Sequence, residues 1–323
     1  MSAMMIREAD KVEIVVLVDN YSDFFLSDTD VAKRLRVLPP SGPLSEPGLS
    51  YLIKVYAGSE THTLLFDTGI SGTCLLHNAQ AFASSMAVMM GQVGANFKDI
   101  EAVVLSHGHF DHFGGLLAFL EQAKKGMPVF LQMDAFVSRR FKVNPQLHID
   151  MPGMDEMALT KAGAKLEKTK EAQTIASDLV LLSGKVARQT DFEKGMPEME
   201  ARINEEWILD PFYDDQGLAV NIKGCGLVVV GGCSHAGIIN TVKHLQKISC
   251  IDKVHAVLGG FHLSGENEKI IDPTIREMKS INPDYIAPMH CTGWKAISRF
   301  AEQMPECFIL NAVGTTYIFQ GQK

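Results

Sequence analysis

The sequence predicts an α/β fold in which two sheets pack face to face and helices cover both outer faces. Short β-branched runs alternate with helical stretches, and this rhythm occurs twice, on either side of a less regular region. A hydrophobic content of 46% over 323 residues provides enough apolar material for one large core. We therefore expect residues 1–323 to form a single domain.

The first half of the chain predicts a run of strands that ends at a histidine cluster. A turn at residues 57–59, Ala-Gly-Ser, joins the second and third of these strands. The segment Leu116–Lys125 has helical spacing and ends at Gly126. The expected strands are Val12–Val18, Tyr51–Tyr56, His62–Phe66, Ile100–Leu105 and Pro128–Leu131.

The region from about residue 133 to 215 is predicted to be an irregular insertion. It is rich in Met, Lys and Glu and shows one clear strand pattern, Leu179–Leu182. We expect it to pack over the core rather than to fold as a separate domain. The stretch Pro39–Gly48 is rich in Pro and Gly and predicts a surface loop.

The second half returns to the regular alternation, and its last two strands close the chain. The expected helices are Ile238–Ile248, Pro273–Ile281 and Lys295–Gln303. The expected strands are Leu218–Ile222, Leu227–Val230, Val254–Leu258, Tyr285–Ala287, Cys307–Leu310 and Thr316–Phe319.

Charge and cysteine content exclude several classes of protein. The net charge of −8, without a basic block, argues against nucleic acid as a partner. The six cysteines form no Cys-x-x-Cys pair, so no zinc knuckle or redox motif is indicated, and Cys225 and Cys233 are expected to be buried thiols. No apolar run is long enough for a membrane span and the N-terminus does not resemble a signal peptide, so we expect a cytoplasmic protein.

Three histidines and an aspartate fall within six residues, directly after a predicted buried strand. In an extended segment, residues two apart point the same way, so His107 and His109 can bind one cation together. A turn would then direct Asp111 and His112 at a second cation nearby. Imidazole and carboxylate ligands suit one or two divalent ions, with zinc first and iron or manganese as alternatives.

The pattern His-x-His-x-Asp-His after an apolar strand resembles the metallo-β-lactamase superfamily, which implies an αββα four-layer sandwich of two mixed sheets. Residues 64–69, Leu-Leu-Phe-Asp-Thr-Gly, are similar to the first motif of that superfamily, and there Asp67 would orient a metal-bound histidine. Residues 231–235, Gly-Gly-Cys-Ser-His, are similar to the third motif, so His235 would complete the first metal site. His290, after Pro288 and Met289, would bind the second metal.

One expected element of the superfamily is missing. A carboxylate usually lies between the third and the last histidine and bridges both metals, but the sequence after Val254–Leu258 is Gly-Gly-Phe-His-Leu. His262 stands near the vacant place, either as a metal ligand or as an acid or base facing the substrate. Without an anionic bridge, we expect a weakly held second metal and partial occupancy of its site.

With this segment in place of the carboxylate, the sequence resembles one subfamily, the 7,8-dihydropterin-6-yl-methyl-4-(β-D-ribofuranosyl)aminobenzene 5′-phosphate synthases. The shared motifs run from about Gly48 to Phe319 and include Cys-Ser-His-Ala-Gly, Gly-Gly-Phe-His-Leu and His-Cys-Thr-Gly. Within the insertion, residues 183–188 are a loose match, in which Arg188 is kept as a candidate anion contact. Phe-Glu at residues 192–193 and Asp-Asp-Gln at residues 214–216 also fit.

Three functions remain open. The resemblance implies a synthase whose metals bind a phosphate or diphosphate substrate, with Asp111 and His262 as the catalytic residues. A hydrolase of a phosphoester, ester or thioester would use a water molecule activated by the metals. A sensor of small molecules that has lost catalysis is the third. A di-iron redox centre is disfavoured because the bridging carboxylate and any Gly-x-Gly-x-x-Gly motif are missing. The expected partner is a small molecule, phosphorylated or pterin-like, and not a membrane.

Overall fold

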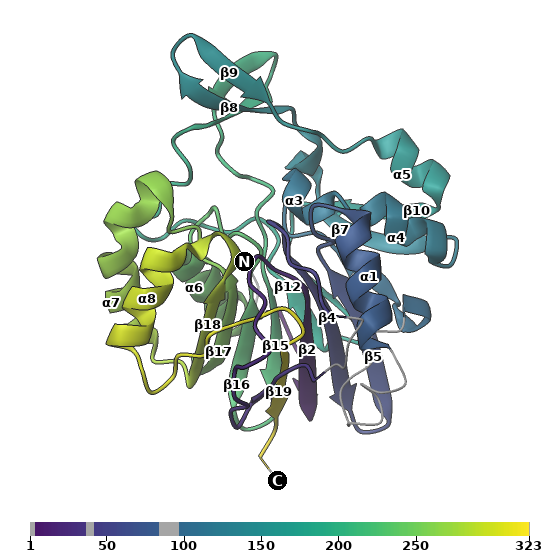
Figure 1. The fold of residues 1–323 in the computed structure, drawn as a ribbon, viewed down its shortest axis with the longest axis vertical. Coiled ribbons are helices and arrows are strands. Elements are labelled where there is room, and N and C mark those ends of the chain that lie inside the picture. The colour runs from purple at the N-terminus through teal and green to yellow at the C-terminus, as the bar shows by residue number, and fades with distance from the viewer. Residues whose placement is uncertain (1–3, 37–41, 84–96, 323) are drawn as a thin grey trace.

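Two β-sheets lie face to face between outer layers of helices (Figure 1) in the computed structural model, which describes residues 4–36, 42–83 and 97–322. This confirms the predicted four-layer α/β sandwich. Both sheets contain parallel and antiparallel pairs and are therefore mixed.

The first sheet, built mainly from the N-terminal half, has the order β10-β7-β6-β5-β4-β2-β19-β3 within the described residues. Strand β2 of this sheet is apolar on both faces. Ile14 and Val16 face the second sheet, while Val15 and Leu17 face helices. Its strands are β2 (Lys11–Val18), β3 (Ala32–Lys33), β4 (Ser50–Ala57), β5 (Glu60–Phe66), β6 (Ala102–Val104), β7 (Met127–Gln132), β10 (Ala164–Thr169) and β19 (Thr316–Gln320).

The second sheet has the order β11-β12-β15-β16-β17-β18, with the short β1 paired to β15. Strands β16, β17 and β18 are parallel neighbours, so their carboxyl ends meet at one edge of the sheet. Its strands are β1 (Glu8–Ala9), β11 (Gln173–Ile175), β12 (Val180–Leu182), β15 (Leu218–Ile222), β16 (Gly226–Val230), β17 (Val254–Gly260) and β18 (Tyr285–Met289).

Helices cover the outer face of each sheet, and three apolar clusters hold the layers together. One cluster fills the space between the sheets, the second lies between the first sheet and α1, α4 and α5, and the third lies under α6, α7 and α8. The helices are α1 (Gly72–Phe82), α3 (Phe110–Phe113), α4 (Leu116–Gln122), α5 (Glu156–Ala162), α6 (Ile238–Ser249), α7 (Ile271–Ile281) and α8 (Trp294–Gln303), with 3₁₀ turns at Phe97–Asp99, Met133–Phe136, Gly265–Ile270 and His290–Thr292.

The region 133–215 contains more strands than the one strand pattern found in its sequence. Four of its strands form a third sheet that projects beyond the sandwich (Figure 1). Their side chains are mostly exposed or half-buried, so they lack the apolar alternation that would have revealed them. These strands, in sheet order, are β14 (Glu206–Leu209), β13 (Met199–Ile203), β8 (Arg139–Asn144) and β9 (Leu147–Asp150).

Two smaller expectations also differ from the structure. The predicted strand Cys307–Leu310 makes only one isolated bridge, from Phe308 to Ile286, because the chain then leaves the edge of β18. Helix α1 was not predicted, although its N-cap Ser71 accepts a hydrogen bond from Cys74 N at 3.2 Å. Of the predicted loop at residues 39–48, positions 39–41 lie outside the described residues and 42–48 contain no helix or strand.

Candidate metal centre

Four strand ends bring most of the predicted site residues together. In the first sheet, β5 ends before Asp67 and the parallel strand β6 ends before the segment that contains His107. In the second sheet, the loop after β16 carries His235, and β18 ends directly before His290. Carboxyl ends of parallel strands are where α/β folds place their ligands. The site therefore lies where the two sheets meet at this edge.

Three histidines form the first group. His109 Nδ1 lies 3.1 Å from His235 Nε2, and the rings of His107 and His235 have centroids 4.9 Å apart. All three side chains are buried. Burial lowers the pKa of each imidazole well below its ordinary value, so the neutral rings offer nitrogen lone pairs.

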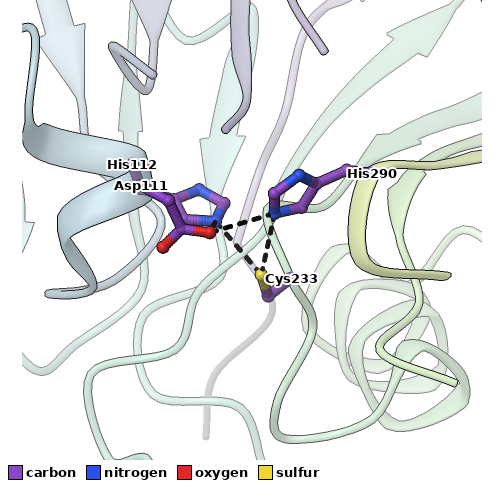
Figure 2. Close-up of side chains that lie close together, drawn as sticks. All are labelled: Asp111, His112, Cys233 and His290. Carbon is purple, nitrogen blue, oxygen red and sulfur yellow. Dashed lines mark hydrogen bonds and ion pairs between the residues drawn. The ribbon is translucent and has the colours of Figure 1, made fainter. Parts of the chain in front are cut away.

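Asp111, His112 and His290 form the second group, shown in Figure 2 together with Cys233. Asp111 Oδ2 lies 3.7 Å from His112 Nε2 and 3.4 Å from His290 Nε2. Burial alone would raise the pKa of Asp111, but the neighbouring histidines hold it well below its usual range. The Asp111 carboxylate is therefore ionised and faces the Nε2 atoms of His112 and His290.

The donor set fits divalent metal ions. Buried ring nitrogens without a hydrogen-bond partner include Nε2 of His107 and of His109. Unpartnered buried polar atoms are costly in a folded protein, and a bound cation would satisfy them. The two groups, three histidines in one and two histidines with a carboxylate in the other, match the ligand types that zinc, iron and manganese accept.

Asp67 fixes the orientation of the second group. Its Oδ2 accepts hydrogen bonds from His112 Nδ1 and Ser106 Oγ, both at 2.7 Å, and its Oδ1 accepts one from Ser106 N at 2.7 Å. With Nδ1 of His112 donating its proton to the carboxylate, Nε2 carries the lone pair that faces Asp111 and Cys233. The sequence motif implied that Asp67 orients a metal-bound histidine, and the histidine that it contacts is His112.

The Asp-Asp-Gln segment at residues 214–216 supports both histidine loops. Asp214 Oδ2 accepts from Gly108 N at 2.7 Å, and Asp215 Oδ2 accepts from Ala236 N at 2.8 Å. Gln216 N donates to Ser106 O at 2.9 Å. Each of these residues therefore fixes the backbone next to a candidate ligand.

A buried arginine completes this support. Arg139 on β8 forms ion pairs of 2.6 Å with both Asp210 and Asp214 and also donates to Gly108 O at 3.4 Å. Two carboxylates offset the desolvation of its guanidinium and keep its pKa raised. The insertion thus contributes directly to the backbone that carries His107 and His109.

The local backbone is unusual at several site positions. Asp67, Ser234, His262 and His290 have φ angles of 57°, 57°, 42° and 55°, in the left-handed region that ordinary residues seldom adopt. Gly108 is required for another reason: a Cβ there would lie 2.0 Å from Ala135 O. Conformations of this kind persist where the surrounding contacts enforce them, often at functional sites.

His262 and Arg188 lie at the rim. The His262 ring packs against His235 with centroids 4.3 Å apart, and its Nδ1 has no hydrogen-bond partner. Glu266 and Glu268 lie in an exposed 3₁₀ turn, so the segment after β17 places no carboxylate between the two groups. Arg188 is exposed and donates to the carbonyls of Glu193 and Pro211 at 3.0 and 3.2 Å. Its anion contact remains a prediction.

Three further residues of the site had no role predicted from the sequence. Phe212 stacks on His235 with ring centroids 4.4 Å apart and an interplanar angle of 9°. Cys233, expected only as a buried thiol, has its Sγ 3.1 Å from His112 Nε2. Arg139 is far in sequence from every motif. Only the position of Cys233 inside the third motif could have signalled its part in the site.

Comparison with known proteins places the chain. The family model of the metallo-beta-lactamase superfamily matches residues 45–126. A 7,8-dihydropterin-6-methyl-4-(beta-D-ribofuranosyl)-aminobenzene-5'-phosphate synthase of Methanocaldococcus jannaschii is 31% identical over 315 residues, which cover 94% of this chain and 96% of that protein. The chain belongs to the metallo-beta-lactamase superfamily. Both the superfamily and the similarity to these synthases were predicted from the motifs, and both are confirmed.

Solved structures of the superfamily share the fold. A metal-dependent hydrolase of the beta-lactamase superfamily is 24% identical, with a TM-score of 0.69 over 97% of this chain and 100% of that chain. The zinc-bound PqqB of Methylobacterium extorquens is 13% identical, with a TM-score of 0.50 over 94% of this chain and 99% of that chain. At these identities the likeness concerns the fold alone. Separately, none of the helices within the described residues is long and apolar enough to cross a membrane.

Proposed function

We propose that this superfamily member is a metal-dependent synthase that joins a dihydropterin methyl diphosphate to an aminobenzene ribosyl phosphate. The observation that carries the proposal is the 31% identity to such a synthase along nearly the whole of both chains. The donor set supports it, because every ligand position of the superfamily except the bridging carboxylate holds a histidine or aspartate. Zinc is the proposed metal, with iron or manganese as alternatives.

The two residue groups would hold one ion each. His107, His109 and His235 form the first site, and Asp111, His112 and His290 form the second. When bound, the ions would act as Lewis acids that neutralise charge on the diphosphate. The protein's own residues keep the ring nitrogens aimed at these positions, since Asp67 and Asp214 fix the loops that carry them.

Proton transfer is assigned to His262 and Asp111. In the proposed reaction the amine of the aminobenzene bonds to the pterin methyl carbon, diphosphate leaves with the bonding electrons, and the amine releases a proton. His262 has an unpartnered Nδ1 beside the first group, and the Asp111 side chain is 24% exposed at the second. His262 would take that proton directly, whereas the low pKa of Asp111 makes its carboxylate a weaker base that orients the amine.

A recess beside the metal centre offers room for the substrate. It has a volume of about 260 Å³, and His290 belongs to its wall together with Asn20 and Trp294. The Trp294 side chain is 75% exposed, so a flat ring can stack on it. We assign this recess to one of the two ring systems.

The test combines both substrates with the metal-loaded protein. Formation of the joined product and release of one diphosphate per product are expected, and both should fall by at least about a thousandfold in His109→Ala. His148→Ala serves as the matched control, because His148 lies half-buried in the projecting third sheet. Equal trace activity in all three proteins would refute synthesis at this site and would leave the hydrolase and the sensor as the remaining functions.

A hydrolase is the second candidate. The observation that favours it is the exposure of Asp111, which opens the second group to water while His112 and His290 stay buried. Phosphodiesterase and thioesterase substrates test it. Diphosphate release in the absence of the aminobenzene substrate, at the rate found in its presence, would favour hydrolysis over synthesis.

A further inference from the structure

Cys233 lies at the centre of the metal centre, which lacks the bridging carboxylate usual in the superfamily. It lies in the loop between β16 and α6, two residues before His235, and is 3% exposed. Figure 2 shows its sulfur directed at the side chains of Asp111, His112 and His290.

The sulfur is close to both candidate metal positions. Cys233 Sγ lies 3.1 Å from His112 Nε2 and 3.3 Å from His290 Nε2. Its distances to ligand atoms of His107 and His235 are all within 4.8 Å. With Zn–S bonds of about 2.3 Å and Zn–N bonds of about 2.0–2.1 Å, ligand atoms of one tetrahedral ion lie about 3–4 Å apart. The sulfur is therefore at ligand spacing from the second group and within reach of the first.

We propose that the Cys233 thiolate is a metal ligand shared by the two sites, in place of the carboxylate that usually bridges them. It supplies the negative charge that the segment around His262 does not. This inference rests on the proposed metal dependence. With this anionic ligand, we expect two firmly bound ions instead of the weakly held second metal expected from the sequence.

The geometry favours Cys233 over the other nearby thiol. Three clusters of potential ligands occur around the site within the described residues, and Cys233 is common to all of them. Cys291 belongs to one, together with His262, and its Sγ points at the Cys233 carbonyl at 3.7 Å. A coordinating cation deprotonates a thiol outright, so Cys233 would act there as a thiolate.

Cobalt(II) provides a test that does not depend on turnover, because a thiolate ligand gives a sulfur-to-cobalt charge-transfer band in the near ultraviolet. The metal-free wild type is titrated with Co²⁺ alone, beside Cys233→Ala, Cys233→Asp, Cys291→Ala and Cys225→Ala. We expect the band to grow over two equivalents in the wild type, Cys291→Ala and Cys225→Ala, and to be absent from both Cys233 variants. Cys225, a buried cysteine at the far end of β16, is the matched control.

Affinity gives the second readout. Cys233→Ala should bind the second equivalent at least about tenfold more weakly, since even supporting contacts to ligands are worth that much. Cys233→Asp should bind the second equivalent of Co²⁺ as tightly as the wild type but without the band. That result would also show that the loop of the variant still folds. A wild-type band that persists in Cys233→Ala, or that disappears in Cys291→Ala, overturns the proposal. Wild type that binds two Co²⁺ without any band overturns it while leaving metal dependence intact, whereas failure to bind Co²⁺ overturns both.

Discussion

Asp67 shows how much of the candidate site rests on single side chains. One carboxylate accepts three hydrogen bonds, and two of the donors belong to Ser106, which precedes the first histidine. The sequence predicted Asp67 and the histidines because their motifs are contiguous and each ends a recognisable strand. It did not predict the central place of Cys233, because only the folded loop brings that sulfur to His112 and His290.

At this scale, Asp67→Asn should weaken metal binding. An amide has only one accepting oxygen, so its NH₂ group would face either Ser106 N or the pair His112 Nδ1 and Ser106 Oγ, and the support of the His112 ring is disturbed. We expect metal affinity to fall about 10–100-fold, as is usual when such a partner is lost. Competition with a chromophoric chelator measures it. Glu101→Gln, which removes the carboxylate 2.8 Å from His62 Nδ1 outside the site, should leave the affinity unchanged.

Elements from the insertion hold the histidine loops in place. Arg139 on β8 pairs with Asp210 and Asp214, and Glu193 accepts from Ile239 N and Asn240 N, both at 2.9 Å, in the first turn of α6. The strands of the third sheet escaped the sequence analysis because their exposed side chains carry no periodic apolar signal. Their role in the site could not be predicted either, since it depends on ion pairs across 71 and 75 residues of chain.

Arg139→Met should strongly destabilise the protein. It leaves two buried carboxylates without a cationic partner, and breaking a buried ion pair from one side costs about 3–5 kcal/mol. Chemical denaturation of the metal-free protein measures this loss. Arg140→Met is the matched control on the same strand, because Arg140 pairs with the partly exposed Glu200 and should cost about 1 kcal/mol or less. Equal effects of the two substitutions would contradict the role given to Arg139.

Glu193 should make stability depend on pH. Burial raises its pKa from the ordinary value of 4.5 to about 7, although two backbone amides oppose the shift. The folded state therefore retains this proton to higher pH than the unfolded state. Its contribution is greatest below pH 4.5 and declines as the pH rises to about 7.

The change in unfolding free energy from Glu193 is expected to be at most about 3 kcal/mol across that window. Glu193→Gln, which cannot ionise, should flatten this part of the pH profile in the metal-free protein. Wild type and variant with parallel profiles between the two pKa values would show that Glu193 does not titrate in this way.

In the whole molecule, two independently patterned sheets meet at the metal centre. The alternation of strands and helices in each half predicted this arrangement, and the elements of the second sheet match closely: β15 spans the predicted Leu218–Ile222, and α6 spans Ile238–Ser249. How tightly the sheets approach could not be predicted, because it depends on contacts between residues far apart. One such contact involves Gly232 and Ser106: a Cβ at Gly232 would lie 2.1 Å from Ser106 Oγ.

Gly232→Ala should therefore damage the site more than the fold. The added methyl displaces Ser106 and crowds Asp67 Oδ2, which would lie 3.2 Å away. We expect at least a tenfold loss of metal affinity, roughly the effect of disturbing a supporting contact. Gly153→Ala, where a Cβ meets nothing within 4 Å, is the control. Isothermal titration with Zn²⁺ on both variants decides the matter, and unchanged affinity in Gly232→Ala would contradict this contact.

The central claim is that the two sheets together hold two metal ions at one edge. Anomalous X-ray scattering from crystals loaded with zinc tests it most directly. We expect two peaks about 3.5–4 Å apart, one among His107, His109 and His235 and the other among Asp111, His112 and His290. A single peak elsewhere, or none at these six side chains, would contradict it.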